Sequence, residues 1–262
     1  MGVRKEITKE IAKETGKLVP ELYIDAIKPT MIIVGERLSM IADMILSPIE
    51  FLGIGKKRLI DWMSTSVALE LRNVIDENII EPDPVLAVPI IQQISYSYGH
   101  EHLRNMYAKL LAKSMDKEMA GYVRTAYVEI LKQLSSMDVE IFEQFDATKV
   151  GKAYILLGHK LTSEDTSYKL DYDMMHTILR CKYTFLEVNL CIQNLSRLGL
   201  IEIQRDLAIN NDKLYEEIMD LKEYSSVFEE ECYECDELVY IKRGQIKLTY
   251  FGYEFMKLVQ GE

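Results

Sequence analysis

Residues 103–116 read Leu-Arg-Asn-Met-Tyr-Ala-Lys-Leu-Leu-Ala-Lys-Ser-Met-Asp, and they show the clearest helical pattern in this 262-residue chain. Their large apolar side chains recur at intervals of three and four positions: Leu103, Met106, Tyr107, Leu110 and Leu111. This spacing places them along one face of an α-helix, where they need another element to pack against. The stretch therefore predicts one helix of a helical bundle.

Further helices are predicted on the C-terminal side of this stretch. The same pattern returns in Val123, Tyr127, Ile130, Leu131 and Leu134. Ser135, followed three positions later by Asp138, predicts the capped start of another helix with Val139, Phe142 and Phe145 on its apolar face. Residues 81–84, Glu-Pro-Asp-Pro, predict a break before the region, because each proline disfavours the α conformation of its predecessor.

Three more helices are predicted nearer the N-terminus. One is amphipathic and covers residues 3–18, and a second runs from about residue 31 to residue 46, after breaks at Pro20 and Pro29. A third begins at Lys56 and runs through Trp62. Because residues 1–18 lack the apolar segment of a signal peptide and four charges interrupt the apolar stretch 31–54, we expect a cytoplasmic protein without a transmembrane helix.

The C-terminal part has a different order of elements. A helix is predicted over residues 183–198 and ends at Gly199, and residues 200–203 and 245–248 predict two short strands. Thr249 can cap a final helix that extends to Val259. Helix, strand, long loop and strand is the order of a winged helix. The sequence therefore predicts a mostly α fold, with a helical bundle over 1–136 and a winged-helix-like domain with a short β-hairpin over 137–262.

Charge is distributed unevenly over these two parts. Residues 1–135 contain 17 basic and 18 acidic residues, whereas residues 136–262 contain 14 basic and 24 acidic ones. The predicted wing, residues 205–237, contains 12 acidic and only 3 basic residues. A winged helix that reads DNA presents a basic surface, so nucleic acid is an unfavourable partner and a protein-contact or structural role is expected.

Two groups of residues resemble metal sites. Cys232 and Cys235 have the spacing of half a zinc site, but no second close pair is present, and reduced thiols in an acidic loop are the simpler interpretation. His100 and His102 are two positions apart, which places them on different faces of a helix. We therefore expect no cofactor, and no arrangement of residues in the sequence indicates a catalytic site.

A possible anion or surface contact is predicted at the start of the third helix. Lys56, Lys57 and Arg58 follow a glycine-containing turn, where backbone N–H groups of a helix N-terminus can hold an anion. Trp62 and the apolar residues of 31–62 could instead contact a membrane surface. Burial of this region in a helical hairpin is the commoner outcome for such a pattern.

The motifs of residues 81–138 resemble those of the Abi-alpha family, bacterial proteins associated with abortive infection. The similar segments are 81–82, 103–116 and 127–135, with 194–201 (Asn-Leu-Ser-Arg-Leu-Gly-Leu-Ile) and 248–252 (Leu-Thr-Tyr-Phe-Gly) in the C-terminal part. The range from the first to the last of these segments, residues 81–252, is about two thirds of the chain. Relatives often carry His-Pro before the 127–135 helix, where this chain has Arg124 and Thr125.

The resemblance implies a cytoplasmic phage-defence protein, and we expect it to act through contacts with a protein partner or as a homo-oligomer. Two alternatives follow from the residues themselves. One is a transcriptional regulator that uses the winged helix, and the other is a membrane-surface effector that uses residues 31–62.

Overall fold

The computed structural model describes residues 21–45, 55–145, 151–160, 168–169, 176–177, 179, 182–221 and 239–260. It divides the chain into two compact units, one formed by residues 1–136 and 256–262 and the other by residues 137–255. The helix predicted over residues 3–18, the turn at 53–54 and the segment 222–238 of the predicted wing lie outside the described residues.

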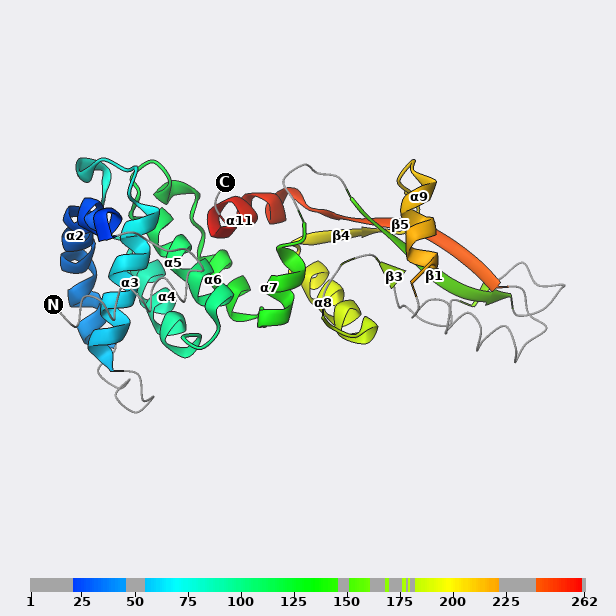
Figure 1. Ribbon diagram of the computed structural model, residues 1–262, viewed down its shortest axis with the longest axis horizontal. Coiled ribbons are helices and arrows are strands. Elements are labelled where there is room, and N and C mark those ends of the chain that lie inside the picture. Colours follow the sequence, from blue (N-terminus) through cyan, green and yellow to red (C-terminus); the bar gives the residue numbers. More distant parts are fainter. Residues whose placement is uncertain are drawn as a thin grey trace. The chain divides into compact units, whose positions relative to one another are not determined.

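The first unit is helical. Its described elements are α2 (Glu21–Ile45), α3 (Lys56–Glu70), the 3-10 turn η2 (Asp76–Asn78), α4 (Pro84–Tyr96), α5 (Glu101–Met115), the 3-10 turn η3 (Ala120–Tyr122) and α6 (Thr125–Lys132) (Figure 1). Helix α2 packs against α3 and α4, and α5 packs against α3, α4 and α6. The predicted helical bundle is therefore confirmed.

The predicted apolar stripe on α5 forms the centre of this unit. Met106, Tyr107, Leu110 and Leu111 are all buried. The break before the region is also confirmed, because Asp83 caps α4 by accepting a hydrogen bond from the Val85 N–H at 2.9 Å. Pro84 occupies the first position of that helix, where a missing N–H has no structural consequence.

The predicted break at Pro29 is wrong, because α2 begins at Glu21 and continues through this proline. Proline removes one backbone hydrogen bond from a helix interior and usually kinks or ends it. Here Pro29 is exposed, while Ile27, Val34 and Leu38 on the same helix are buried against the bundle. Tertiary packing of the apolar face thus holds the helix together across the missing bond.

The second unit combines a sheet with helices. Its elements are α7 (Ser136–Phe142), β1 (Lys152–Lys160), β2 (Tyr168–Lys169), β3 (His176–Thr177), α8 (Phe185–Arg197), β4 (Ile201–Gln204), α9 (Asp212–Met219) and β5 (Val239–Leu248), and α11 (Tyr250–Gln260) follows β5 (Figure 1). The described strands are antiparallel in the order β2-β1-β5-β4, and β3 also pairs with β1. The fold is mostly helical with a small sheet, as predicted.

The sheet is larger than the predicted hairpin of two short strands. The predicted pair is present, with Ile201 opposite Leu248 and Gln204 opposite Gln245. Strand β1 was not predicted, and it pairs with β5 from Lys152 opposite Ile246 to His159 opposite Val239. The first half of β5 therefore has β1 as its partner, which explains why β5 begins well before the predicted strand at residue 245.

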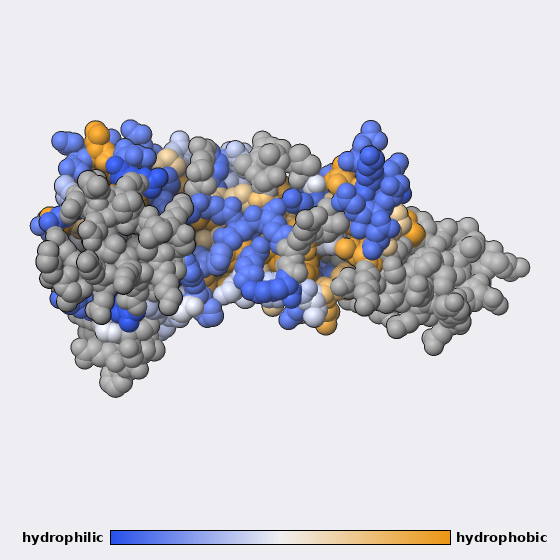
Figure 2. Space-filling view, in the orientation of Figure 1, coloured by the Kyte–Doolittle hydropathy of each residue, from blue (hydrophilic) through white to orange (hydrophobic). Residues whose placement is uncertain are grey.

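The predicted wing contains a helix that the sequence analysis did not identify. Tyr215 and Ile218 of α9 are buried against Ala153 and Ile155 of β1. The exposed residues of α9 are all charged, namely Asp212, Lys213, Glu216 and Glu217, and Figure 2 shows the hydrophilic surface over this helix. Helix α9 is thus a covering layer on the sheet, and the winged-helix arrangement itself stays a prediction.

Candidate protein-contact site

Helix α8 is defined at both ends by local hydrogen bonds. At its start Thr184 and Glu187 form a capping box, in which the Thr184 N–H donates to Glu187 Oε2 at 2.8 Å and the Glu187 N–H donates to Thr184 Oγ1. The hydrogen bonds from Thr184 lower the pKa of the Glu187 carboxyl. At its end Gly199 has a φ of +73°, and the Leu200 N–H donates to Leu195 O at 3.0 Å.

Helix α8 carries large apolar side chains both on its buried inner face and on its exposed outer face. The inner face consists of the buried residues Val188, Asn189, Cys191, Ile192 and Leu195. On the outer face Leu186 and Leu190, one turn apart, are 57% and 62% exposed. Two large apolar side chains side by side on an exposed helix face are typical of a protein-binding surface. We call Leu186, Leu190, Gln193 and Arg197 the outer face of α8.

A chain of polar contacts joins α8 to α7. Asp138, which is buried, accepts a hydrogen bond from Asn194 Nδ2 at 3.1 Å. Asn194 Oδ1 in turn accepts from Arg197 Nη2 at 2.7 Å. At the other end of α8, Lys182 Nζ lies 3.2 Å from Glu140 Oε1, and this contact raises the pKa of Lys182. These contacts fix how the outer face of α8 is presented on α7.

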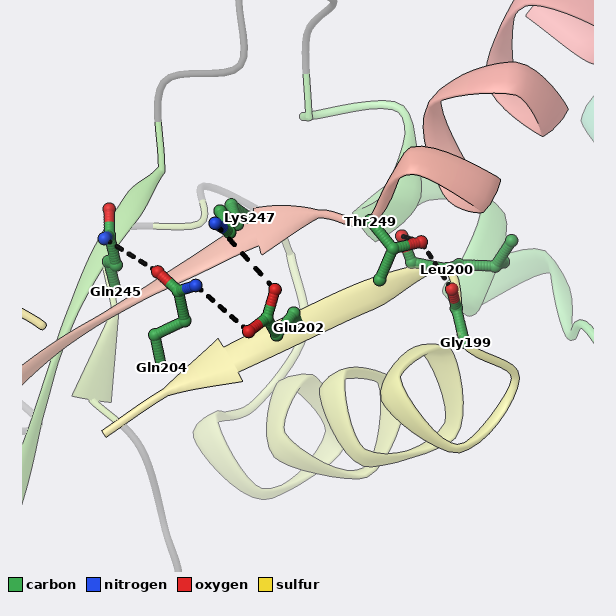
Figure 3. Close-up of polar contacts among 7 residues, drawn as sticks. All are labelled: Gly199, Leu200, Glu202, Gln204, Gln245, Lys247 and Thr249. Carbon is green, nitrogen blue, oxygen red and sulfur yellow. Dashed lines mark hydrogen bonds and ion pairs between the residues drawn. The ribbon is translucent and has the colours of Figure 1, made fainter. Parts of the chain in front are cut away.

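Strands β4 and β5 carry a ladder of polar side chains next to α8 (Figure 3). Gln245 Nε2 donates to Gln204 Oε1 at 2.9 Å, Gln204 Nε2 donates to Glu202 Oε1 at 3.0 Å, and Lys247 Nζ lies 3.8 Å from Glu202 Oε2. These donors and acceptors satisfy one another across the strands. The ladder stabilises the hairpin and gives it little net charge.

Thr249 joins the end of this hairpin to the final helix. Its Oγ1 donates to Gly199 O at 2.6 Å (Figure 3). The same Oγ1 accepts from the Gly252 N–H at 2.8 Å. The predicted cap of the final helix is thereby confirmed. The contact also brings together segments 194–201 and 248–252, which are far apart in the sequence.

Two basic residues of β5 are paired with acidic residues of the wing. Lys242 Nζ lies 2.8 Å from Asp206 Oδ1, and Arg243 Nη1 lies 2.5 Å from Asp212 Oδ1. The contact with Lys242 lowers the pKa of the Asp206 carboxyl. The guanidinium of Arg243 also lies over the ring of Tyr215, 5.0 Å from its centroid.

Two buried tyrosines contact Gly244 of β5 and differ in their hydrogen bonding. The Tyr215 hydroxyl donates to Gly244 O at 3.2 Å and accepts from the Ile209 N–H at 2.7 Å. The Tyr154 hydroxyl is buried and has no hydrogen-bond partner among the described residues, and its ring lies against Gly244, where no larger residue fits. Burial raises the pKa of Tyr154 to about 12; the nearby Arg205 lowers it, and Asp206 and Tyr215 raise it.

Replacing Tyr215 by phenylalanine should lower the free energy of unfolding by about 1–3 kcal/mol, because the buried Gly244 carbonyl and the half-buried Ile209 N–H lose this hydrogen-bond partner. The Tyr154→Phe variant is the matched control, and it should change stability by less than about 0.5 kcal/mol or increase it, because its hydroxyl has no partner to lose. Urea unfolding followed by circular dichroism measures both values. Equal losses of unfolding free energy in the two variants would contradict the difference in hydrogen bonding between the two hydroxyls.

Stability should also fall at alkaline pH because of Tyr154. Its folded pKa is raised from 10.0 to about 12, so the folded protein retains a proton that the unfolded chain releases. The contribution is complete below pH 10 and is lost as the pH rises towards 12, up to about 2–3 kcal/mol. Urea unfolding at several values between pH 9 and pH 12 should show a smaller loss for Tyr154→Phe than for the unchanged chain.

The described residues of the predicted anion or surface contact differ in exposure. Lys57 and Arg58 are exposed at the start of α3, where Lys56 is the first residue. Trp62 is only 4% exposed, and the guanidinium of Arg104 lies 4.3 Å from its ring centroid. The contact at residues 56–58 stays a prediction, and the Trp62 ring would not take part in it.

The apolar residues that suggested a membrane-surface effector are described only in part, because residues 46–54 lie outside the described residues. Within the described part of α2, Val34, Leu38 and Ile41 are buried, whereas Ile32 is 54% exposed. Over the described ranges of the chain, no helix combines the length and apolar character needed to cross a bilayer.

The cysteine pair and the histidines that resembled metal ligands lie in differently described parts of the chain. Cys232 and Cys235 lie outside the described residues, and Cys191 is buried in α8. Where side chains are described, no group of three or more His, Cys, Asp or Glu residues could hold a metal ion. His100 precedes the first residue of α5, as predicted for a polar helix start, and its Nδ1 lies 2.9 Å from Ser136 Oγ.

The outer face of α8 was missed in the sequence analysis, although a signal for it was present. Leu186 and Leu190 do not share the helical spacing of Val188, Cys191 and Leu195, so one helix cannot bury both sets. Apolar residues on the side opposite a buried stripe indicate a second contact.

Comparison with known proteins gives one match. The family model of abortive infection alpha matches residues 55–259, which is most of the chain. No curated protein and no solved structure matches the chain significantly. The matched range includes the α4–α5 region, α8 and the β4–β5 hairpin with its Thr249 contact. The chain therefore belongs to the abortive infection alpha family.

Proposed function

We propose that this protein is a bacterial, cytoplasmic phage-defence factor that acts by binding a protein partner through the outer face of α8. Membership of the abortive infection alpha family suggests the defence role. The observation that carries the finer proposal is the exposure of Leu186 and Leu190, 57% and 62%, on a helix whose opposite face is buried. Apolar side chains at i and i+4 are the usual anchors of a helix in a protein interface.

Charge pairing on the β4–β5 hairpin supports a protein partner over DNA. Lys242, Arg243 and Lys247 of β5 each lie within 4 Å of an acidic side chain of the same unit. Basic residues that bind phosphate must be available to replace the counterions of DNA. The wing, with 12 acidic and 3 basic residues, would also repel a phosphate backbone.

The proposed binding requires no catalytic step and no cofactor. The contacts on α7, α8 and the hairpin connect side chains to one another and to the backbone, and they account for the presentation of the outer face of α8. On this proposal, defence depends on what the outer face of α8 contacts during infection.

The outer face of α8 should be required for protection against phage. Expression of the unchanged chain in a phage-sensitive host is expected to reduce plaque numbers, with early death of infected cells. The Leu186→Glu/Leu190→Glu variant should lose this protection, because two charges at the centre of the contact would be desolvated on binding. Plaque counts over a panel of phages measure the effect.

The matched control is Leu207→Glu, which changes a leucine that is 56% exposed outside α8. This variant should protect as well as the unchanged chain, and circular dichroism should show that both variants are folded. Full protection by the folded α8 variant would refute the binding proposal. A salt-dependent mobility shift with genomic DNA that the α8 variant abolishes would favour a transcriptional regulator instead.

A further inference from the structure

Helix α4 in the first unit has an outer face without any charge. The run of residues 84–99 contains no Asp, Glu, Lys or Arg. On the outer face of the helix Val85 is 67% exposed and Tyr96 is 66% exposed. Gln92 between them is also exposed, and Pro89 is half-buried. These four residues lie at i, i+4, i+7 and i+11, which is one stripe along an α-helix.

The first unit does not need this stripe for its own core. The inner face of α4 already buries Leu86, Ala87, Ile90, Ile91 and Ile94. A helix that is uncharged on all sides is typical of a buried element, because exposed helix faces normally carry charged residues. Interface cores are depleted of charge and enriched in tyrosine, which are the two features of this stripe.

We propose that two copies of this chain associate through α4, with the two helices antiparallel about a two-fold axis. In this arrangement Val85 of one copy packs against Tyr96 of the other, and Pro89 packs against Gln92. Tyr96 of each copy therefore meets the smaller Val85 of the other, and because of the two-fold axis each contact occurs twice.

The distribution of charge favours a second copy as the occupant. Residues 136–262 carry 24 acidic and 14 basic residues, so two copies that met through this part would repel each other. Residues 1–135 carry 18 acidic and 17 basic residues, and the α4 stripe carries none of them. Self-association through α4 therefore brings together the least repulsive surfaces of the two copies.

The association should depend on concentration. A helix of 13 residues spans about 20 Å, and one such helix pair provides less area than the roughly 1,600 Å² of a standard stable interface. We expect a dimer in equilibrium with the 30.4 kDa monomer, with a dissociation constant below about 100 µM. The contact lies in the first unit, so its existence does not depend on whether α8 binds a partner.

The register can be tested by mixing two full-length variants, Val85→Cys and Tyr96→Cys, under mild oxidation. Peptide mass mapping should find a disulfide that joins position 85 of one copy to position 96 of the other. Neither variant alone should form a link between equivalent positions, because these would lie about 16 Å apart along the antiparallel pair, beyond disulfide reach. Links between equivalent positions, or none in the mixture, would overturn the proposed arrangement.

Sedimentation tests the association itself. The Val85→Glu/Tyr96→Glu variant should be monomeric at concentrations where the unchanged chain dimerises, with at least a tenfold weaker association. The control Ile32→Glu/Tyr122→Glu changes two residues that are 54% and 61% exposed elsewhere in the first unit, and it should dimerise normally. A monomeric unchanged chain, or a folded α4 variant that still dimerises, would overturn the proposal.

Discussion

The Gly252→Ala variant should lose about 3 kcal/mol or more of its free energy of unfolding, because an added methyl group has no space at this position. A Cβ atom on Gly252 would overlap the carbonyl group and Cα of Leu200. Both obstacles are backbone atoms, and Leu200 O also accepts a hydrogen bond from the Thr249 N–H at 3.1 Å. The strand cannot retreat without breaking the pairing of Ile201 with Leu248.

Gly121→Ala is the matched control for this prediction. A Cβ atom on Gly121 would have nothing within 4 Å, and its φ does not lie in the left-handed region. Urea unfolding should therefore give a value within about 0.5 kcal/mol of the unchanged chain for Gly121→Ala. If Gly252→Ala proves equally harmless, the close approach of α11 to Leu200 is not a feature of the protein in solution.

The Arg104→Ala variant should lose about 3 kcal/mol of stability and change the fluorescence of the protein. Arg104 is 2% exposed, and its guanidinium lies 4.3 Å from the centroid of Trp62 and 4.6 Å from that of Tyr98. Its Nη1 also donates to Tyr98 O at 2.8 Å. Removal of the side chain leaves a cavity between the two rings and removes the cation–π contacts.

Tryptophan fluorescence reports on the surroundings of Trp62 alone, because Trp62 is the single tryptophan of the chain. Its emission should shift to longer wavelength in Arg104→Ala, as water reaches the ring. The emission wavelength of Arg104→Lys should lie between those of the unchanged chain and Arg104→Ala, since lysine keeps the positive charge but cannot stack as a planar group. Arg72→Ala removes an exposed arginine that donates to Leu69 O, and it should leave both emission and stability unchanged. An unshifted emission in a folded Arg104→Ala variant would contradict the burial of Trp62.

The helices of the first unit were predictable because their signals are local. The stripe of α5 and the Asp83–Pro84 start of α4 each lie within a few residues, and the structure contains them as predicted. The effect of Pro29 was misjudged because it depends on packing between segments that are distant in the sequence. Its local effect opposes a helix, and packing of Val34 and Leu38 against distant helices outweighs that effect.

The strands of the second unit were only partly predictable. The β4–β5 pair was found because Gly199 and Thr249 mark its ends. Strand β1 has an apolar run without alternation, and such a run does not distinguish a strand from a buried helix. Its partner β5 is distant in the sequence, and no local pattern specifies that pairing.

By itself, the sequence determined the family, the helical bundle and the ends of α8 and α11, because periodicity, caps and family motifs are properties of short segments. Only the tertiary structure decided that Trp62 is covered by Arg104, that α9 lies on β1, and that Leu186 and Leu190 remain exposed. The physical reason is that burial is a relation between segments that are distant in the chain. An apolar residue on a helix shows that a contact is needed, and the folded structure shows whether the chain itself provides it.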